Sequence, residues 1–483
     1  MLDLPRTHSL FIDNTHVPAR DGDPIDVVDP STGEVFTQIA GGGRDDIDLA
    51  VAAARRAAEG GWGRTTALER GRILMRLAAL VQTHGETLAE IESADTGKPI
   101  RQARADAIAL ARYFEYYGGA ADKLHGQTLP YQNGYMVLTL REPHGVTGHI
   151  IPWNYPMQIF GRSVGAALAV GNACVVKPAE DACLSLLRTA ELAAEAGLPP
   201  GALNIVTGLG PLAGQALAEH PGIDHISFTG SPETGRRVAE AAAAHHCPVT
   251  LELGGKSPQV VFADADIDAA LPVLVNAIVQ NCGQTCSAGS RVLVERAVHE
   301  RVIDALAGRF AALRAGPANL DLDVGPLISS KQLARVRAYL SESSAGGVRT
   351  VAQGSVQADV PRGGYYQPPV LLDGVAARDR LFQDEIFGPV LVTTVFDDEA
   401  QALALANDTP YGLVAGVWTR DGARQMRMAR GIRSGQVFIN NYGAGGGVEL
   451  PFGGVKRSGY GREKGFEALY GFTTLKTIAI KHD

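Results

Sequence analysis

VTGHIIPWNYPMQIFGRSVGAALAVGNACVVKP, residues 146–178, decides the fold class, because two short apolar segments flank an alanine-rich segment of helical character. The alternation continues to residue 253 through LNIVTG, HISFTG and VTLEL, and a further helical segment separates each strand from the next. Short apolar strands that alternate with helices form a parallel sheet that helices cover on both faces. The stretch therefore predicts an α/β domain built from βαβ units.

The rest of the chain predicts a second lobe of the same class. A similar rhythm of strands and helices resumes after residue 287 through RVLVE, VLVTTVF, LVAGVW and QVFIN. The two lobes are expected to join near 252–290, and a chain of 483 residues is long enough for two or three domains. Before the first lobe we expect short strands over 1–43 and helices that begin at Asp45 and span about 66–93 and 99–119.

Two further segments read as isolated strands. Residues 126–142 (GQTLPYQNGYMVLTLRE) and 472–483 (FTTLKTIAIKHD) alternate between apolar and polar side chains. A lone strand pair is marginal in water, and such pairs often complete the sheet of a partner subunit. We therefore expect a homodimer or a homotetramer.

Composition excludes several classes of protein. The chain has 44 Lys and Arg against 52 Asp and Glu, a net charge of −8, which is too acidic for a broad nucleic-acid surface. None of the uncharged stretches reads as a membrane span, and the N-terminus lacks the apolar core of a signal peptide. Five scattered cysteines argue against a disulfide framework. We expect a cytoplasmic protein with neither a nucleic-acid nor a membrane partner.

The segment NCGQTCSAGSR, residues 281–291, offers a nucleophile. Cysteine is strongly nucleophilic at neutral pH when its pKa is lowered or a base stands nearby. The segment alone does not choose between Cys282 and Cys286, and a buried structural cysteine is the alternative for either. One C-x₃-C pair without a companion pair makes no zinc site, so we expect no metal.

Two polar residues at strand ends could support that nucleophile, since ligands bind at the carboxyl ends of the strands in open α/β sheets. Glu252 in LELGGKSP could act as a general base if burial raises its pKa, although a solvated loop glutamate is the alternative. Asn154, between the prolines of PWNYP, could stabilise an oxyanion with its amide, although asparagine also forms turns.

Four segments could hold a dinucleotide. Ser231 in FTGSPETG lies at the start of a helix, where free N–H groups suit a pyrophosphate, and GLGPLAG deviates by one residue from a dinucleotide fingerprint. Lys177 and Glu180 in VVKPAE could bond ribose hydroxyls, with a solvated ion pair as the alternative. Glu385 in EIFGPV could accept from a ribose diol while Phe387 supplies an apolar wall, unless Phe387 is plain core.

Together, PWNYP, KPAE, FTGSPETG, LELGGKSP, GQTCSAGSR and EIFGPV resemble the NAD(P)-dependent aldehyde dehydrogenase superfamily, over about residue 10 to the end. The resemblance implies a Rossmann-like cofactor domain, an α/β catalytic domain and a small β oligomerisation element. We place the NAD-binding domain at 1–123 and 143–253, the catalytic domain at 254–455, and the oligomerisation element with the C-terminal tail at 124–142 and 456–483.

The resemblance also implies roles for individual residues. Cys286 matches the nucleophile and Cys282 does not, Glu252 matches the general base, and Asn154 matches the oxyanion donor. Lys177 is expected to serve both catalysis and cofactor binding. The implied cofactor contacts are Ile151, Trp153, Lys177, Glu180, Gly210, Phe228, Gly230, Ser231, Gly235, Glu385 and Phe387. A carboxylate at Glu180 repels a 2′-phosphate, so NAD is expected, with NADP as the weaker alternative.

The substrate is expected to be a small-molecule aldehyde. Arg162 and Tyr155 are the candidate substrate contacts, and an arginine at this position resembles semialdehyde dehydrogenases, in which it holds a distal carboxylate. A helix arginine paired with a nearby acid of the protein is the alternative for Arg162. Gln280 departs from the succinate-type enzymes, which carry a second arginine there, and the glycine-rich loop 440–447 suggests a roomy mouth. Other readings are a CoA-acylating relative, a cysteine hydrolase and a non-catalytic binding protein on this fold.

Overall fold

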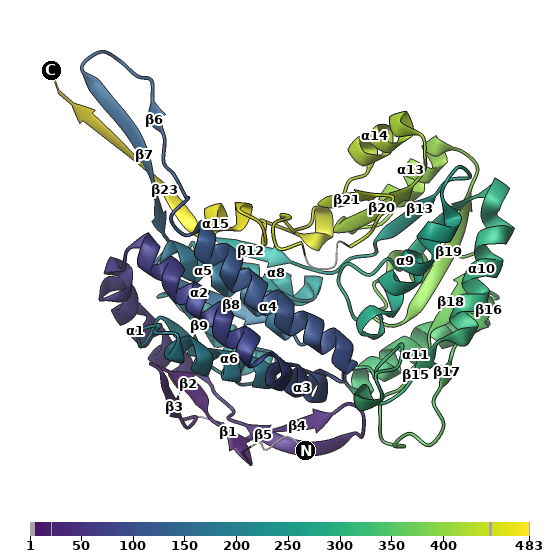
Figure 1. Ribbon diagram of the computed structural model, residues 1–483, viewed down its shortest axis with the longest axis horizontal. Coiled ribbons are helices and arrows are strands. Elements are labelled where there is room, and N and C mark those ends of the chain that lie inside the picture. Colours follow the sequence, from purple (N-terminus) through teal and green to yellow (C-terminus); the bar gives the residue numbers. More distant parts are fainter. Residues whose placement is uncertain (1–4, 21, 444–446, 483) are drawn as a thin grey trace.

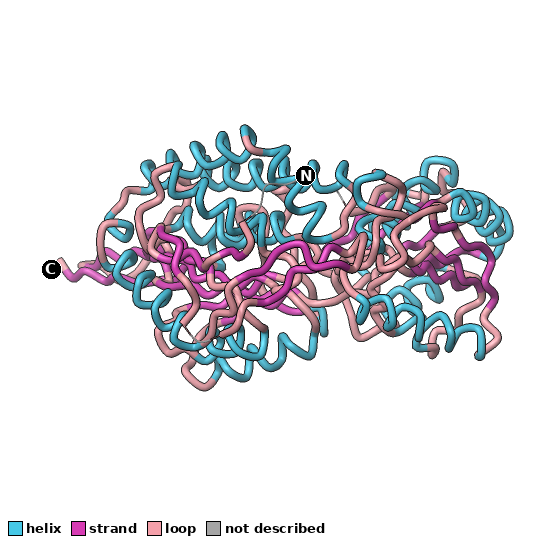
Figure 2. The backbone as a smooth tube through the Cα atoms, turned by 90° about the horizontal axis from the view of Figure 1, so that it is seen from below, coloured by secondary structure: helices cyan, strands magenta, loops and turns pink. Residues whose placement is uncertain are grey.

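The computed structural model describes residues 5–20, 22–443 and 447–482, and it has two α/β lobes and a projecting arm of three strands (Figure 1). Each lobe is built on one sheet, and helices lie on both faces of the strands (Figure 2). The α/β fold class predicted from the sequence is confirmed. Among the described residues, no helix has both the length and the apolar character needed to cross a membrane.

The first lobe contains an eight-stranded sheet in the order β22-β12-β11-β8-β9-β10-β2-β3. Its five central strands are parallel and match the apolar segments that the sequence predicts. Three antiparallel edge strands, which the sequence did not place in this sheet, extend it. The bounds are β2 Leu10–Ile12, β3 Thr15–Val17, β8 Val146–Ile151, β9 Ala173–Pro178, β10 Leu203–Ile205, β11 His225–Thr229, β12 Val249–Glu252 and β22 Gly459–Tyr460.

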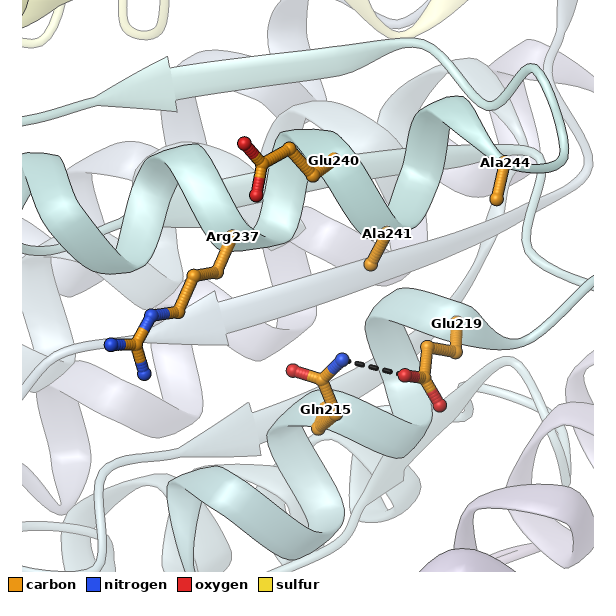
Figure 3. A pocket seen from close by; sticks show the side chains of 6 residues that line it. All are labelled: Gln215, Glu219, Arg237, Glu240, Ala241 and Ala244. Atoms are coloured by element: carbon orange, nitrogen blue, oxygen red, sulfur yellow. Dashed lines mark hydrogen bonds between the residues drawn. The ribbon is translucent and has the colours of Figure 1, made fainter.

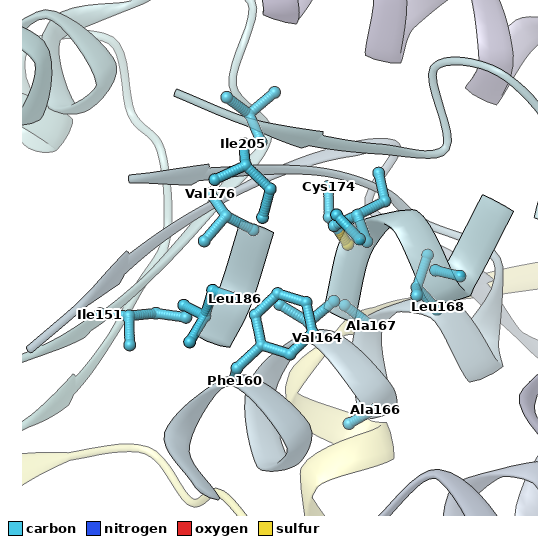
Figure 4. Packing of buried hydrophobic residues seen from close by; sticks show 14 of the residues in the cluster. Ile151, Phe160, Val164, Ala166, Ala167, Leu168, Cys174, Val176, Leu186 and Ile205 are labelled. Atoms are coloured by element: carbon cyan, nitrogen blue, oxygen red, sulfur yellow. The ribbon is translucent and has the colours of Figure 1, made fainter. Parts of the chain in front are cut away.

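Helix α5 (Pro156–Val170) lies at the centre of this lobe and is almost wholly buried. Pro156 occupies its first turn, where a missing N–H costs nothing, and Gly171 ends it with a left-handed φ of 102°. Its apolar side chains pack against those of the sheet and of helix α6, as Figure 4 shows for Phe160, Val176 and Leu186. The residues that follow β8 are therefore anchored by the core immediately behind them.

The helix expected over 66–93 is two helices, α2 (Ala67–Thr83) and α3 (Gly85–Thr96). The chain leaves helical geometry at His84, next to Gly85, a residue that weakens a helix interior. The other helices of the lobe are α1 Arg44–Glu59, α4 Ile100–Ala120, α6 Leu184–Glu195, α7 Gln215–Glu219, α8 Pro232–Ala243 and α15 Glu467–Gly471. A small sheet near the N-terminus holds β1 Thr7–His8, β4 Ile25–Asp29 and β5 Glu34–Ile39.

The second lobe contains a seven-stranded sheet in the order β16-β18-β19-β14-β13-β20-β21, parallel except at β16. Its strands are β13 Pro258–Val261, β14 Arg291–Glu295, β16 Arg349–Gln353, β18 Val370–Asp373, β19 Val390–Phe396, β20 Val414–Trp418 and β21 Gln436–Ile439. Its helices are α9 Ile267–Val279, α10 His299–Ala312, α11 Ser330–Ala345, α12 Arg380–Gln383, α13 Glu399–Asn407 and α14 Gly422–Gly431. The short strands β15 Arg314–Ala315 and β17 Ser355–Val356 pair with each other.

The two segments that read as isolated strands meet in the arm. Strand β23 (Thr473–Lys481) pairs antiparallel with β7 (Tyr135–Pro143) along its whole length, and β6 (Thr128–Leu129) adds to the other side. The arm projects away from both lobes (Figure 1). Met136 and Leu475 are more than half exposed on it, so the sheet presents apolar side chains to the outside.

Candidate active site

The site lies where the first lobe's strands end, because polar loops follow the carboxyl ends of parallel neighbours. Strands β8 and β9 pair Ile150 with Lys177, and β11 and β12 pair Thr229 with Glu252. The loops that carry Asn154 and Ser231 follow directly from β8 and β11. The structure thus brings together the strand ends that the sequence singled out.

The two candidate cysteines have different environments. Cys282, with an exposed fraction of 1%, packs in the core of the second lobe and adopts a left-handed φ of 55°. Cys286 is partly exposed and packs against the small cluster of Leu413, Val414 and Phe452. The geometry distinguishes the two thiols, which the residues alone did not.

Asn154 lies against the loop that carries Cys286. Its Nδ2 donates to the carbonyl oxygen of Gln284 at 3.0 Å, and its own carbonyl oxygen accepts from Asn281 Nδ2 at 2.8 Å. The neighbouring Tyr155 hydroxyl is 3.0 Å from Thr285 Oγ1, next to Cys286 in the chain. These contacts fix an amide donor beside the nucleophile candidate.

Glu252 is a buried carboxyl group at the site whose loss of hydration is not offset by hydrogen bonds from the described residues. Only 2% of the residue is exposed, and neither carboxylate oxygen has a hydrogen-bond partner among the described residues. Burial raises the pKa of this carboxyl well above its ordinary value, although the nearby Arg162 opposes the shift. A Cβ at Gly453 would lie 2.8 Å from Glu252 Oε1, so that glycine leaves room for the carboxylate. Such a group suits a general base.

Arg162 faces a carboxylate of the protein itself. Its guanidinium forms a buried ion pair with Glu463, and its Nη2 donates to Thr229 Oγ1 at 3.1 Å. Glu463 also accepts from Ser227 Oγ at 2.5 Å. The arginine, 6% exposed, lies over the Phe452 ring at 5.1 Å from its centroid. Glu463 could not be predicted as the partner of Arg162, because no local sequence pattern links the two residues.

Lys177 and Glu180 form one unit at the end of β9. Lys177 Nζ is 2.7 Å from Glu180 Oε2, and Gly210 N–H donates to Glu180 Oε1 at 3.4 Å. Burial alone would raise the pKa of Glu180, but the Lys177 ammonium holds it below its ordinary value. The carboxylate therefore stays ionised at neutral pH and is held in a fixed position.

The N-terminus of α8 is packed tightly beneath Ser231, whose hydroxyl accepts from Thr234 N–H at 3.3 Å. A Cβ at Gly230 would lie 2.6 Å from the Phe228 ring, and one at Gly235 would lie 2.6 Å from Leu253. A separate shallow groove lies between α7 and the C-terminal half of α8, away from this turn (Figure 3). Free N–H groups at such a turn suit a phosphate.

Glu385 and Phe387 reach this region from the second lobe. Glu385 Oε1 accepts from Gly255 N–H at 3.0 Å, and a Cβ at Gly254 would lie 2.3 Å from Glu385 Oε2. Burial raises the pKa of Glu385 to about 7. Phe387, with a left-handed φ of 61°, packs edge-on against Trp153 at 5.4 Å. The glycines, the ionised carboxylate of Glu180 and the aromatic rings of Trp153 and Phe387 together fit a dinucleotide.

The remaining candidates occupy the same region. Ile151 ends β8, Phe228 lies on β11, and Gly210 begins a short π-helical turn, Gly210–Gly214, before α7. The glycine-rich loop 440–447 includes residues 444–446, which lie outside the described residues.

Comparisons with known proteins agree with this geometry. The model of the "Aldehyde dehydrogenase family" matches residues 16–478. A hydroxyisobutyraldehyde dehydrogenase of Mycolicibacterium austroafricanum is 42% identical over 472 residues, 98% of this chain and 93% of that protein. A crystal structure from Burkholderia cenocepacia, assigned as an aldehyde dehydrogenase, is 69% identical with a TM-score of 0.98 and covers 98% of this chain and 100% of that one.

An NAD⁺ complex of an aldehyde dehydrogenase from Bacillus cereus is 39% identical with a TM-score of 0.96, covering 99% of this chain and 97% of that one. The match extends over both lobes and the arm, and it includes the loops that form the site. The chain therefore belongs to the aldehyde dehydrogenase family.

Proposed function

We propose that the protein oxidises an aldehyde to a carboxylic acid with NAD, using Cys286 as nucleophile, Glu252 as general base and Asn154 as oxyanion donor. The observation that carries the proposal is the buried Glu252 carboxylate, whose two oxygens have no hydrogen-bond partner among the described residues, in a site shared with the partly exposed Cys286. A buried carboxyl with no structural partner is costly unless the site uses it.

The first step is attack of the Cys286 sulfur on the aldehyde carbon. Burial raises the pKa of this thiol to about 12, although the positive charge of Arg162 opposes the shift. The thiol must therefore lose its proton to the solvent before the sulfur attacks. The product is a thiohemiacetal on Cys286, whose oxyanion accepts from Asn154 Nδ2 and from the Cys286 N–H.

Six residues would hold the dinucleotide: Lys177, Glu180, Ser231, Trp153, Glu385 and Phe387. NAD, when bound, supplies the oxidising power by accepting a hydride from the substrate carbon. A thioester then remains on Cys286, and Glu252 removes a proton from water as that water attacks the acyl carbon. The carboxylic acid leaves and the Cys286 thiol is restored.

A preference for NAD over NADP is supported by the ionised carboxylate of Glu180, which Lys177 holds in place. A 2′-phosphate near this carboxylate would meet a like charge in a partly desolvated cleft. The Bacillus cereus relative was solved with NAD⁺. The position, partners and burial of each named residue support its proposed role.

Arg162 does not favour the semialdehyde alternative, because its guanidinium is already neutralised by Glu463 and is almost completely buried. A second carboxylate from a substrate would have to displace Glu463 or share the cation with it. We propose instead that Arg162 is a positioning residue, which holds Glu463 and places a positive charge near Glu252 and Cys286.

The arm supports a homodimer or a homotetramer in which its apolar side chains are covered by another copy. Light scattering at micromolar concentration tests this assembly, and a monomeric mass would contradict it. We also propose an NAD-binding domain at 1–123 and 143–253, a catalytic domain at 254–455, and an oligomerisation element with the C-terminal tail at 124–142 and 456–483. We propose a cytoplasmic location, because the five free cysteines suit a reducing compartment.

The test of the function is incubation with NAD and a panel of aldehydes while the absorbance of the reduced cofactor is followed. We expect turnover in the wild type and none in Cys286→Ala. A hydrolase or a binding protein would produce no reduced cofactor, and a CoA-acylating enzyme would require CoA.

A further inference from the structure

A small cavity lies in the second lobe, beside the segment that links the two sheets. Its lining includes Lys256, Ser257, Arg291, Tyr411, Arg433 and Ser434. Its volume of about 10 Å³ admits a single particle the size of a water molecule or a small ion. None of its described lining residues is an aspartate or a glutamate.

Lys256 is the principal polar group of this cavity. The residue is 1% exposed, and its Nζ has no hydrogen-bond partner among the described residues. Ser434 Oγ, in the same lining, is also buried and has no hydrogen-bond partner among the described residues. Unpaired buried donors are costly, so an occupant that accepts hydrogen bonds would be favoured.

Arg291 adds a permanent positive charge. Three of its N–H groups donate to main-chain oxygens, at 2.8 Å to Lys256, 3.0 Å to Leu405 and 3.1 Å to Ala406. Within the described residues neither Arg291 nor Lys256 forms an ion pair within 4.0 Å. A guanidinium keeps its proton in proteins, so the positive potential persists whether or not Lys256 is charged.

We propose that this cavity binds one small monovalent anion of the halide class, held by Lys256 Nζ and Ser434 Oγ in the field of Arg291. A buried cation that forms no ion pair is stabilised by an anion more than by water, because the low dielectric strengthens the attraction. The site lies next to Gly255, whose neighbour in space is the Cys286 carbonyl oxygen. The anion would therefore stabilise the segment that connects the two sheets.

Anion binding should also depend on pH. Burial, and then the charge of Arg291, lower the pKa of Lys256 to about 7, while Glu385 and Asp384 oppose that shift. Arg433 and Tyr411 also line the cavity, and Asp408 acts on Arg291. Since an anion favours the protonated amine, affinity rises as pH falls through 7.

The experiment uses the full-length protein in chloride-free gluconate buffer with bromide as the probe. Crystals soaked in bromide should give an anomalous peak within hydrogen-bond distance of Lys256 Nζ. At equal ionic strength, the thermal midpoint should be higher in bromide than in gluconate, by an increment that grows with the logarithm of bromide concentration and is larger at pH 6.5 than at pH 8.5. Lys256→Met should lose both responses, and Lys331→Met, on the exposed face of α11, should keep both.

The wild-type measurements are decisive even if Lys256→Met does not fold. Absence of an anomalous peak at Lys256 Nζ overturns the proposal and leaves a water in the cavity. Equal thermal midpoints in bromide and gluconate overturn it as well, because a specific anion would have to stabilise the folded state.

Discussion

Arg162 and Glu463 form a buried ion pair, although they lie on α5 and on the segment that follows the second lobe. Glu463 is wholly buried, and its other oxygen accepts from Ser227. The pair lies close enough to Glu252 and Cys286 to affect the titration of both.

Arg162→Leu is expected to destabilise the protein by about 3–5 kcal/mol, because it leaves Glu463 buried without its partner. Chemical denaturation measures this loss, and the double variant Arg162→Leu/Glu463→Leu should recover part of it. In any folded Arg162 variant the pH–rate profile should shift upward in pH, since the cation lowers the pKa of Glu252 and of Cys286. Unchanged stability, with a selective loss of activity toward carboxylate-bearing aldehydes, would instead identify Arg162 as a substrate contact.

Cys286→Ala is expected to abolish dehydrogenase activity, whereas Cys282→Ala should retain most of it. The first thiol is accessible beside Asn154, and the second is packed in the core. Steady-state rates with NAD and one good aldehyde make the comparison, and circular dichroism confirms folding. Equal losses from the two substitutions would contradict the assignment.

Glu252→Gln is expected to stall release of the acid, because the amide cannot take a proton from water. A rapid burst of reduced cofactor should then precede slow turnover in stopped-flow measurements. In the wild type, turnover should rise with pH through the raised pKa of Glu252, since only the ionised form is a base. The variant should lack that limb of the profile. Absence of a burst would show that Glu252 also deprotonates Cys286 before attack.

Glu180→Ser is expected to raise kcat/KM for NADP relative to NAD. Repulsion between the fixed carboxylate and a 2′-phosphate is worth at most about 4 kcal/mol at an effective dielectric of 20, so the gain is at most about 10³-fold. The ratio of kcat/KM values for the two cofactors measures it, with Glu300→Ser on the exposed surface of α10 as the control. A wild type that prefers NADP would refute the argument.

Stability should fall as the pH drops below 6.5, because two buried histidines resist protonation in the folded state. Burial lowers the pKa of His149 to about 3 and lowers that of His225 well below its ordinary value. The unfolded chain binds these protons near pH 6.5, so each histidine costs at most about 1.4 kcal/mol per pH unit below that value. Urea unfolding between pH 5 and 8 measures the slope. His149→Gln should flatten it and the exposed His125→Gln should not.

Local patterns predicted the strands and the loops that follow them. Apolar segments bounded by glycine and proline identify β8 to β12, and the rule that ligands bind at strand ends selects Asn154, Lys177 and Glu252. Contacts between distant segments could not be predicted in this way. The Arg162–Glu463 pair depends on packing that brings the last part of the chain against the first lobe. The same packing surrounds Glu252, whose carboxylate oxygens have no hydrogen-bond partner among the described residues.

The break between α2 and α3 and the short strand β22 could not be predicted from the sequence, for local reasons. The apolar spacing of 66–93 continues through His84, so periodicity alone does not reveal the break between α2 and α3. Strand β22 has two residues and no strand pattern, and it is recognised only by its pairing with β12.

That pairing makes the second lobe an insertion within the first. Leu251 and Glu252 on β12 pair with Tyr460 and Gly459, and Ser227 and Glu463 are separated by 236 residues in the chain. A fragment that stopped at residue 253 would leave β12 as a bare sheet edge, open to pairing with other chains. It would also lack the segment that holds Arg162 in place. The first lobe is therefore not a separable module, and dissection of this protein by truncation would be expected to yield aggregation rather than an isolated cofactor-binding unit.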